Sequence, residues 1–552
     1  MRERLHPPIV CCPGVRLATL GLLIGCSSPF DALDRDDPSP QTITAVSPEV
    51  YIPQLRFNEV MPKNDSTIMD PSLNFPDWVE IVHMDDARLP LGRVTLDNDQ
   101  GDHWQGPDGE SLAPGAHLLL WANGDGDTPD TLPFTLTDGV GSLTLSVDGV
   151  PVDALTLPDL PGDVSTARYP DGGAWAITTR PTPGATNGND PGTLTDPSDL
   201  LFGDTRILDI SLTLDSAAVA SLWADPYTEV QGSLAFEGAF FPRVGINLKG
   251  VYGSLRNLSQ KCSFKVDLNA YDDHQLKGLE KLAFNNMVQD ASYTHEYLVY
   301  TLFRAMGVPA PRVGYARVYV NGVYYGLYAH IEAPDNTFLA RWYADPTGLL
   351  YEGAYGVDFY DSYLWSFEQD QGPDDDDRSE LAALITALNA PADDAGIAQV
   401  EALFDLDEFL AEMAVEAIAY HWDGYESANN YRIYLDPLTM RFSMLPWGAD
   451  QTFHDAYYEP YDSAARLFAY CKSNAGCSAR YGAKLREAAD VMDSLGLEAE
   501  MDRLNSWLYA EMNADPRREF GMDTHDQSIE QTRAVLRASP ERVRQSASAH
   551  GG

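Results

Sequence analysis

Short stretches rich in β-forming residues dominate the chain between about residues 51 and 188. Clusters of Gly, Pro, Asp and Asn separate these stretches, and no helical period of useful length occurs before about residue 200. This pattern is typical of strands joined by turns. We therefore predict an all-β region of sandwich or barrel type, with strands at Gln54–Val60, Trp78–His83, His117–Trp121, Ser142–Val147 and Ala174–Thr179.

The pattern changes after a linker at residues 189–200, which is rich in Gly, Pro, Asp and Thr. Strands continue at first, and longer helical periods follow. Strands are predicted at Ile207–Leu212, Val230–Phe236, Val244–Leu248, Tyr315–Val320, Val323–His330, Tyr431–Leu435 and Phe442–Pro446. Helices are predicted at Ser216–Ala224, Tyr293–Met306, Ser379–Leu388, Leu406–Tyr420, Ala483–Leu495 and Leu497–Met512. This order predicts a two-lobed α+β domain over residues 201–540, with a tail at residues 541–552.

The first residues carry the features of an export signal. A basic start precedes a short apolar run that ends in Leu23–Cys26 (L-I-G-C). A basic region, an apolar region and small residues predict a signal peptide over residues 1–25. The ending resembles the bacterial lipobox, which implies a lipidated Cys26, a flexible tether at residues 26–50 and a membrane-anchored protein of the cell envelope. The alternatives are ordinary signal cleavage and a wrongly assigned start. Ser27 and Ser28 favour the outer membrane or cell surface.

Composition narrows the class of protein. The chain has 552 residues, of which 44% are hydrophobic, enough for several folded domains. It has 83 acidic and 37 basic residues, a formal net charge of -46. Such a surface repels phosphate backbones, so we expect no nucleic-acid partner. The excess acid favours solubility in a salty or divalent-rich medium, and specific calcium or magnesium sites are compatible with it.

The six cysteines fall into two groups. The export segment contains Cys11, Cys12 and Cys26. Cys471 and Cys477 flank a small polar segment, and because disulfides persist in exported proteins we predict that they pair. Cys262 is then a free, buried thiol, and none of the spacings indicates a zinc site.

Three motifs of the all-β region together resemble those of a known domain family. They are Asn58–Met61 (N-E-V-M), Asp77–Glu80 (D-W-V-E) and Pro181–Asn187 (P-T-P-G-A-T-N). Together they resemble a lamin-tail domain, an immunoglobulin-like β-sandwich, over residues 51–188. The resemblance implies a binding or spacer module whose partner the sequence does not name. Asn123–Asp130 (N-G-D-G-D-T-P-D) is read as an acidic hairpin turn, with a calcium loop as the alternative.

The second region contains residues suited to phosphoryl transfer. That reaction needs cations for the phosphates, metal ligands and a carboxylate near the accepting hydroxyl. Lys249 and Lys265 belong to early strands, and Glu296 on the following helix could pair with one of them or simply be exposed. Later, Asp423 is followed by two amides and, after a strand, by a second acid; these residues are Asn429, Asn430 and Asp450. Amide and carboxylate oxygens suit a hard divalent cation.

A series of motifs in the same order resembles the spore-coat CotH kinase family, an atypical branch of the protein-kinase-like superfamily. The most specific are Asn321–Tyr328 (N-G-V-Y-Y-G-L-Y) and His421–Tyr425 (H-W-D-G-Y), with Leu445–Trp447 (L-P-W) ahead of Asp450. The resemblance implies ATP-dependent phosphorylation of Ser or Thr in a protein substrate, with Mg²⁺ or Mn²⁺ as the metal and Ca²⁺ as a further option.

The resemblance also assigns roles to residues. Lys249 and Lys265 would contact phosphates, and Glu332 would lie near the adenine. Asp423 would be the catalytic carboxylate. Asp450 and either Asn430 or Asn429 would hold the metal.

One departure stands out. The family often has Trp-Asp-x-Asp after the strand, whereas this chain has Gly448 at the first acidic position. Two main functions therefore stay open: an exported, lipid-anchored kinase, and a catalytically inactive kinase-like adhesion or scaffold lipoprotein. A phosphohydrolase is a third, lesser alternative.

Overall fold

The computed structural model describes residues 53–136, 141–192, 196–203, 206–373, 377–454 and 459–550. The expected signal peptide, the lipidation site at Cys26 and the tether lie outside the described residues. No described helix is both long and apolar enough to cross a membrane.

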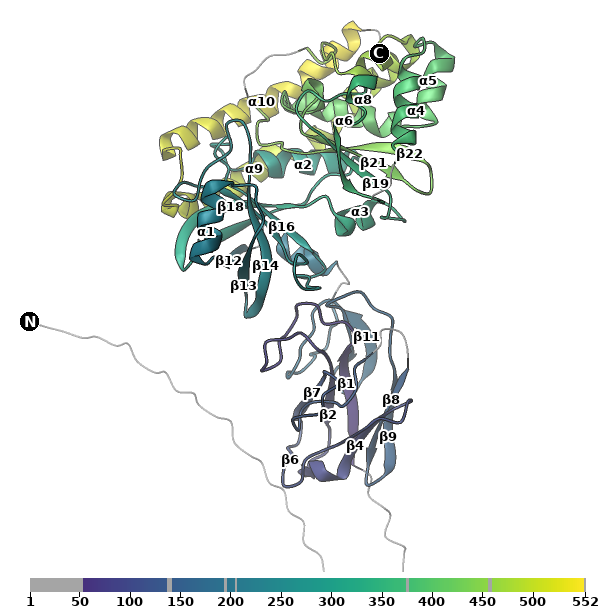
Figure 1. The fold of residues 1–552 in the computed structure, drawn as a ribbon, viewed down its shortest axis with the longest axis vertical. Helices are drawn as coiled ribbons and strands as arrows, with labels where there is room; N and C mark the ends of the chain where they lie inside the picture. The colour runs from purple at the N-terminus through teal and green to yellow at the C-terminus, as the bar shows by residue number, and fades with distance from the viewer. Residues whose placement is uncertain are drawn as a thin grey trace, which may run out of the picture. The chain divides into compact units, whose positions relative to one another are not determined.

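Two antiparallel sheets form the β-rich region that follows (Figure 1). One has the order β11 (Ala174–Thr178), β10 (Ser165–Tyr169), β1 (Leu55–Met61), β2 (Asp77–His83), β7 (His117–Ala122). The other has the order β5 (His103–Gln105), β4 (Val94–Asn98), β8 (Ser142–Val147), β9 (Val150–Thr156). A short pair, β3 (Leu89–Pro90) and β6 (Ser111–Leu112), and the turn η1 (Leu91–Arg93) complete it. Both sheets contribute to one core, for example Phe57 and Ile81 from the first and Leu96 and Leu145 from the second. The all-β prediction is correct for the described residues, which form a sandwich.

The three motifs at Asn58–Met61, Asp77–Glu80 and Pro181–Asn187 meet in a buried polar network. The Glu80 carboxylate accepts hydrogen bonds from the Asn58 side chain (2.9 Å) and from the backbone N–H of Gly184 (2.6 Å). The Glu59 carboxylate accepts two from Thr182, both at 3.0 Å. The network therefore attaches the closing segment at residues 181–187 to β1 and β2. Glu80 has a structural role, because it joins β2 to this segment.

A closed seven-stranded barrel follows the helical turn η2 (Pro197–Leu201). Its strands, in order around the barrel, are β12 (Ile207–Thr213), β13 (Val230–Phe236), β14 (Ala239–Lys249), β15 (Ser263–Asp267), β16 (Lys281–Asn285), β18 (Val323–Glu332) and β17 (Val313–Val320). Parallel pairing of β12 with β17 closes it, and α1 (Ser216–Ala224) lies after β12. Alternate residues such as Phe264, Phe284 and Tyr328 form the interior.

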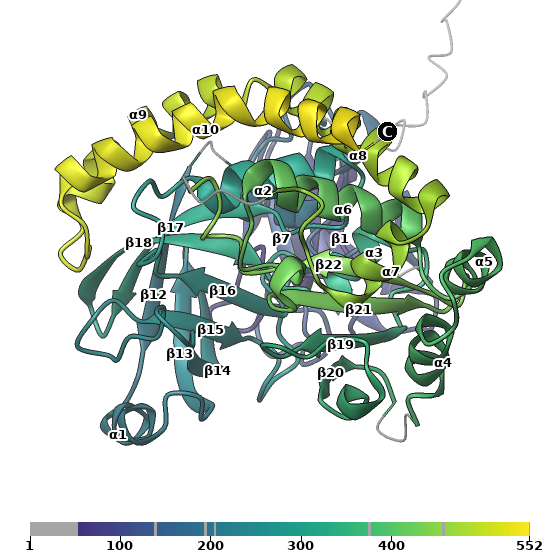
Figure 2. The ribbon, with the colours of Figure 1, turned by 90° about the horizontal axis from the view of Figure 1, so that it is seen from above.

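A second, largely helical core packs against the barrel. It contains Tyr315, Ala329 and Ile331 from the outer face of β17 and β18 together with residues of the helices. The helices are α2 (His295–Ala305), α3 (Asn336–Trp342), α4 (Ser379–Leu388), α5 (Asp394–Glu401), α6 (Leu406–Ala419), α7 (Arg466–Lys472), α8 (Ala475–Leu495), α9 (Leu497–Ala514) and α10 (Met522–Ala549). A sheet of order β20 (Phe367–Gln371), β19 (Leu349–Gly353), β21 (Tyr431–Asp436), β22 (Arg441–Pro446) belongs to this part, with η3 (Asp361–Tyr363) and η4 (Tyr425–Ser427). In Figure 2, α10 runs along α8, and α2 lies beside α6.

Some elements differ from those predicted. Helix α8 begins at Ala475, and Asn474 caps it by accepting a hydrogen bond from the N–H of Cys477. Helix α10 was not predicted, and it continues to Ala549, past residue 540 where we expected a tail to begin. Its sequence is polar apart from a narrow buried stripe, which only the packing reveals. Cys471 and Cys477 form a disulfide with Cα atoms 5.3 Å apart, and Cys262 is a buried free thiol.

Candidate functional site

Asp423 lies on a short loop that follows α6. Hydrogen bonds from backbone N–H groups of this loop to a side chain of α6 hold it in place. Helix α6 ends at Ala419, and the capping residue Tyr420 has a φ of 55°, in the left-handed region. The Glu416 side chain, one turn earlier, accepts hydrogen bonds from the backbone N–H groups of Tyr425 (2.7 Å) and Glu426 (3.0 Å). His421, which belongs to the same loop, is fully buried, and burial lowers its pKa to about 4. The loop is therefore fixed on both sides of Asp423.

Three side-chain amides surround the Asp423 carboxylate. Asn429 and Asn430 each donate to it at 3.0 Å, and Gln451 donates at 3.2 Å. Burial raises the pKa of Asp423, although these hydrogen bonds act in the opposite direction. Neither Asn429 nor Asn430 uses its side-chain oxygen as a hydrogen-bond acceptor for a described residue. Both oxygens are thus left as neutral ligands beside a carboxylate.

Asp450 follows β22 on a loop that reaches α2. Its backbone carbonyl accepts a hydrogen bond from Nδ1 of His295 at 3.0 Å. Its carboxylate, in contrast, accepts no hydrogen bond from a described residue. Burial raises the pKa of Asp450 well above its ordinary value; the negative charges of Glu296, Asp290 and Asp423 raise it further, and Lys249 lowers it. A cation at this place would relieve that repulsion.

Gly448 marks the departure from the family pattern, and the structure shows what it packs against. Its φ is 55°, a backbone conformation that favours glycine. A Cβ atom at this position would come within 2.7 Å of the Asn430 side chain. Asn430 therefore occupies the space beside Gly448, and its own φ of 47° is also left-handed. Such backbone conformations are often concentrated at functional sites.

Lys249 and Glu296 come close together, but not as a direct ion pair. Oδ1 of Asn285 accepts a hydrogen bond from Nζ of Lys249, and Nδ2 of Asn285 donates to both Glu296 oxygens at 2.9 Å. Burial lowers the pKa of Lys249 to about 8 and raises the pKa of Glu296 to about 7. Nζ of Lys249 also lies 5.0 Å from the centre of the Trp447 ring.

The two remaining candidates have different surroundings. The Lys265 side chain is exposed on β15, and its charge acts on Lys249. Glu332 is buried and ion-paired with Arg312 at 2.7 Å and Arg341 at 3.0 Å. The structure thus brings Lys249, Glu296, Asp423 and Asp450 together, whereas Glu332 belongs to a separate arginine cluster.

The sequence did not predict three contacts of the site. Asn285 accepts a hydrogen bond from Lys249, Gln451 donates one to Asp423, and the Trp447 ring lies near the Lys249 ammonium group. A signal for Asn285 existed, since it ends a β-strand ten residues ahead of the helix that carries Glu296. Gln451 is adjacent to Asp450, but nothing in the sequence indicates that it donates to Asp423. These contacts join residues far apart in the chain, which motif spacing does not report.

The donor set fits a divalent cation that arrives with a phosphate ligand. Among the described residues, no three His, Cys, Asp or Glu side chains converge as a complete metal cage. The site instead offers the Asp423 and Asp450 carboxylates and the amide oxygens of Asn429 and Asn430. Mg²⁺ typically uses one or two carboxylates together with phosphate and water oxygens. Oxygen donors and an uncompensated acid therefore fit Mg²⁺ or Mn²⁺.

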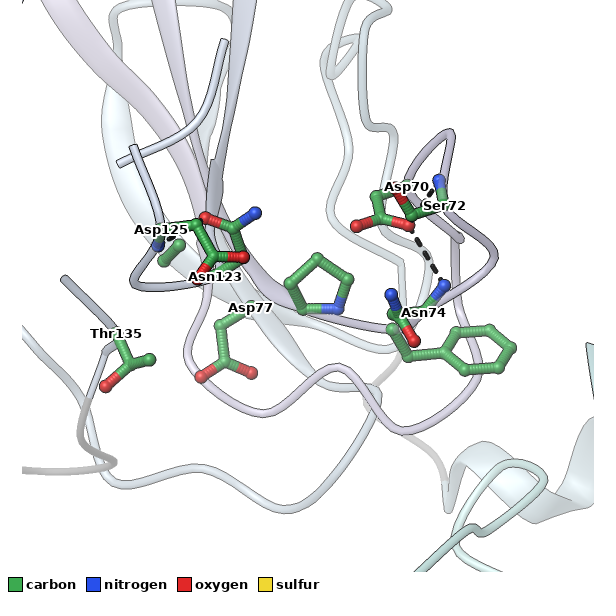
Figure 3. Close-up of a pocket in the computed structure, with 10 residues that line it drawn as sticks. Asp70, Ser72, Asn74, Asp77, Asn123, Asp125 and Thr135 are labelled. Atoms are coloured by element: carbon green, nitrogen blue, oxygen red, sulfur yellow. Dashed lines mark hydrogen bonds between the residues drawn. The ribbon is translucent and has the colours of Figure 1, made fainter. Parts of the chain in front are cut away.

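A hollow of about 420 Å³ lies elsewhere, on the sandwich (Figure 3). Asp70 and Asn74 line it from the loop before β2, and Asn123 and Asp125 line it from the loop after β7. Asp70 already accepts hydrogen bonds from the N–H groups of Ser72 and Asn74. Asp77, also on this hollow, accepts a hydrogen bond from the N–H of Asn64. These acids thus bind their own loop, whereas the Asp450 carboxylate accepts no hydrogen bond from a described residue, which favours the region of Asp423 as the functional site.

The family model described as "CotH kinase protein" matches residues 246–541, more than half of the chain. The chain belongs to the CotH kinase protein family. Asp423, Asp450 and Lys249 all lie inside the matched segment, whereas the whole sandwich precedes it.

Relatives within the CotH family share modest identity with the chain. "Invasin CotH2" of Rhizopus delemar is 27% identical over 256 residues, 43% of this chain and 43% of that protein. "Invasin CotH3" of the same organism is 26% identical over 255 residues, 43% and 42% of the two chains. "Inner spore coat protein H" of Bacillus subtilis is 23% identical over 196 residues, 34% of this chain and 53% of that protein. The similarity thus spans about half or less of each relative.

Proposed function

We propose that this protein is an ATP- and divalent-metal-dependent kinase that phosphorylates Ser or Thr hydroxyl groups of proteins outside the cytoplasm. The observation that carries the proposal is the Asp450 carboxylate, which accepts no hydrogen bond from the described residues and faces three further acids and one lysine. Such an arrangement destabilises the empty site and favours a bound cation.

The residues divide the work of phosphoryl transfer between them. Lys249 donates hydrogen bonds to phosphate oxygens, and Lys265 adds positive charge at the edge of the site. The Asp423 carboxylate accepts the proton of the attacking hydroxyl. The raised pKa of Asp423 makes it a stronger base than an exposed aspartate. Asn429 and Asn430 hold that carboxylate in place and present their oxygens to the metal.

When bound, Mg²⁺ or Mn²⁺ would neutralise charge on the phosphate groups, with Asp450 and Asn430 or Asn429 as ligands. Family membership supports the phosphate chemistry, and the fold alone does not decide activity. The alternative, an inactive scaffold, is favoured by the missing acid at Gly448. The packing of Asn430 against Gly448 supports the active reading, because an amide oxygen stands at that place.

The test uses the full chain with radiolabelled ATP, MgCl₂ or MnCl₂, and dephosphorylated casein as the acceptor. We expect label on the chain or on casein, and a thermal shift with ATP that requires the metal. Asp423→Asn should abolish the labelling, and the exposed control Asp526→Asn should retain it. Equal labelling in wild type and Asp423→Asn would contradict the proposal. Absence of both labelling and thermal shift in wild type would favour the scaffold.

The proposal includes export and anchoring through Cys26. Its support is the Leu23–Cys26 motif after a basic and apolar start. In a bacterial host, the wild-type chain should incorporate radiolabelled palmitate and fractionate with membranes. Cys26→Ser should lose the label, and Cys12→Ser should keep it; label retained in Cys26→Ser would contradict anchoring at this residue.

A further inference from the structure

Lys249, Asn285 and Glu296 form a chain of hydrogen bonds that crosses three elements. Lys249 ends β14, Asn285 ends β16, and Glu296 lies in the first turn of α2. The amide oxygen of Asn285 accepts from Lys249, and its amide nitrogen donates to both oxygens of Glu296. A neutral side chain therefore separates the ammonium group from the carboxylate.

A second neutral group, the Trp447 ring, also lies close to Lys249. Nζ of Lys249 lies 5.0 Å from the Trp447 ring centre, and Cζ of Arg432 lies 4.9 Å from the same ring. An indole face attracts cations without neutralising them. Among the described residues, no carboxylate lies within ion-pair distance of Lys249. Arg432, by contrast, is neutralised by Glu352 and Asp370.

The strand register explains why Asn285 is suited to this place. Side chains alternate between the two faces of a strand. Phe284 points into the barrel core, so Asn285 points outward, on the same face as Lys249. Asn286 takes the other direction and donates to the carbonyls of Ser254 and Lys261 in the loop between β14 and β15. Two consecutive amides thus hold the lysine and the adjoining loop.

We propose that Asn285 is a positioning residue that holds the Lys249 ammonium between itself and Trp447, with its remaining N–H groups directed at nucleotide phosphates. An ammonium has three donors, and one is used by Asn285. A direct pair with Glu296 would have neutralised the charge that phosphates need. This inference rests on the proposed kinase function for its purpose, but the placement of Lys249 by Asn285 does not depend on activity.

The first experiment measures Lys249 itself, without nucleotide. The full chain is acylated with acetic anhydride over a range of pH, and the modified fraction at Lys249 is read by mass spectrometry. Charged groups that act on Lys249 are Glu296, Lys265, Arg432 and Asp450. Asn285→Asp gives the ammonium a direct counter-ion, so the pH of half-maximal reaction should rise by about one unit.

The matched control is Asn269→Asp, the same change at an exposed asparagine of the barrel segment. It should leave the Lys249 profile unchanged. An unchanged profile in Asn285→Asp would overturn the proposal, and so would an equal shift in both variants. Asn285→Ala provides a second measurement if the aspartate variant does not fold: its profile should also differ from wild type, because the hydrogen-bond acceptor is gone.

The second experiment separates this proposal from the kinase assignment. In an active protein, Asn285→Ala should raise KM for ATP about tenfold, the effect of one hydrogen bond to a charged group, with kcat changed much less. Asn269→Ala should leave both values unchanged. A normal KM in Asn285→Ala with an active wild type would overturn the positioning role alone. A wild type that neither binds nor uses ATP would overturn the proposed function, while the acylation profile would still decide what holds Lys249.

Discussion

Acids with raised pKa values occur both in the β-sandwich, where Glu80 is fully buried, and at the junction of barrel and helices, where Asp450 is half-buried, but their surroundings differ. In the sandwich, Glu80 accepts hydrogen bonds from Asn58 and Gly184. At the junction, the Asp450 carboxylate accepts none from the described residues and faces other acids. Burial raises the pKa in both places, to about 8 for Glu80. A raised pKa therefore does not distinguish the two regions, whereas hydrogen-bond satisfaction does.

The difference separates a structural acid from a functional one. A carboxylate with its donors in place stabilises the fold that supplies them, and its removal leaves those donors unpaired. A carboxylate without donors destabilises the fold, and such groups persist where a ligand uses them. The following changes are ordered from the largest expected effect to the smallest.

Asp450→Asn should separate activity from stability most strongly. We expect phosphoryl transfer to fall by about 10³-fold, comparable with the loss of a group that stabilises transition-state charge. The melting temperature should stay the same or rise, because an uncompensated negative charge is removed. Radiolabelled ATP transfer and differential scanning calorimetry measure the two quantities. A large loss of stability would show that Asp450 is structural, and Asp526→Asn controls for the substitution itself.

Glu80→Leu should have the reverse effect. It removes one of the two acceptors of the Asn58 amide, which keeps Asp171, and leaves the Gly184 N–H unpaired, so the sandwich should lose about 2–4 kcal/mol of unfolding free energy. Phosphoryl transfer should be unaffected. Hydrogen exchange across β1 and β2 provides the local measurement, and Glu110→Leu is the exposed control. Unchanged hydrogen-exchange rates in Glu80→Leu would contradict the structural role of Glu80 and with it the contrast with Asp450.

Helix α6 offers an intermediate case, because Glu412 is fully buried and neither of its oxygens has a hydrogen-bond partner. Burial raises its pKa well above the ordinary value, and the pKa of neighbouring Glu416 rises to about 8. The folded protein therefore binds more protons than the unfolded chain between pH 4.5 and about 8. Stability from these groups is full at the acidic end and is lost as pH rises through about 8.

Glu412→Gln should remove part of the stability loss that occurs as pH rises. At pH 8.5 the variant should be more stable than wild type by about 1–2 kcal/mol, equivalent to roughly one pKa unit, and at pH 5 the two should be similar. The lowered pKa of His421, about 4, acts in the opposite sense, because its stability is present above about pH 6.5 and is lost as pH falls through about 4. Melting temperatures from pH 5 to 8.5 test this, and parallel curves for both proteins would contradict it.

Gly448→Ala and Gly184→Ala form the smallest and most closely matched pair. Both glycines have positive φ, 55° and 77°, so each alanine should cost about 1 kcal/mol of backbone strain. Only at Gly448 would the new Cβ meet a side chain, that of Asn430, and nothing lies within 4 Å at Gly184. We therefore expect weaker metal-dependent ATP binding in Gly448→Ala alone. Isothermal titration of ATP with MgCl₂ measures this affinity. Equal affinities in the two variants would show that a Cβ atom beside Asn430 does not disturb ATP binding.

Local sequence patterns determined the elements that carry the site. The hydrophobic period of α6 and the strands β21 and β22 were predicted within a few residues, because each pattern belongs to one element with one buried face. The loop from His421 to Tyr425 was also identifiable, since its residues are adjacent in the chain. Prediction failed for α10, whose buried stripe, including Ile529 and Val543, is narrow in a polar sequence.

Only the tertiary structure decided how distant residues meet. The barrel closes through parallel pairing of β12 with β17, which are about a hundred residues apart. The amide of Asn285 lies between Lys249 and Glu296, and Gln451 donates to Asp423. A hydrogen bond between residues far apart in sequence depends on the packing of whole elements, which no local pattern records. The sequence by itself thus determined which acids are present, and the packing decided which of them lack hydrogen-bond donors.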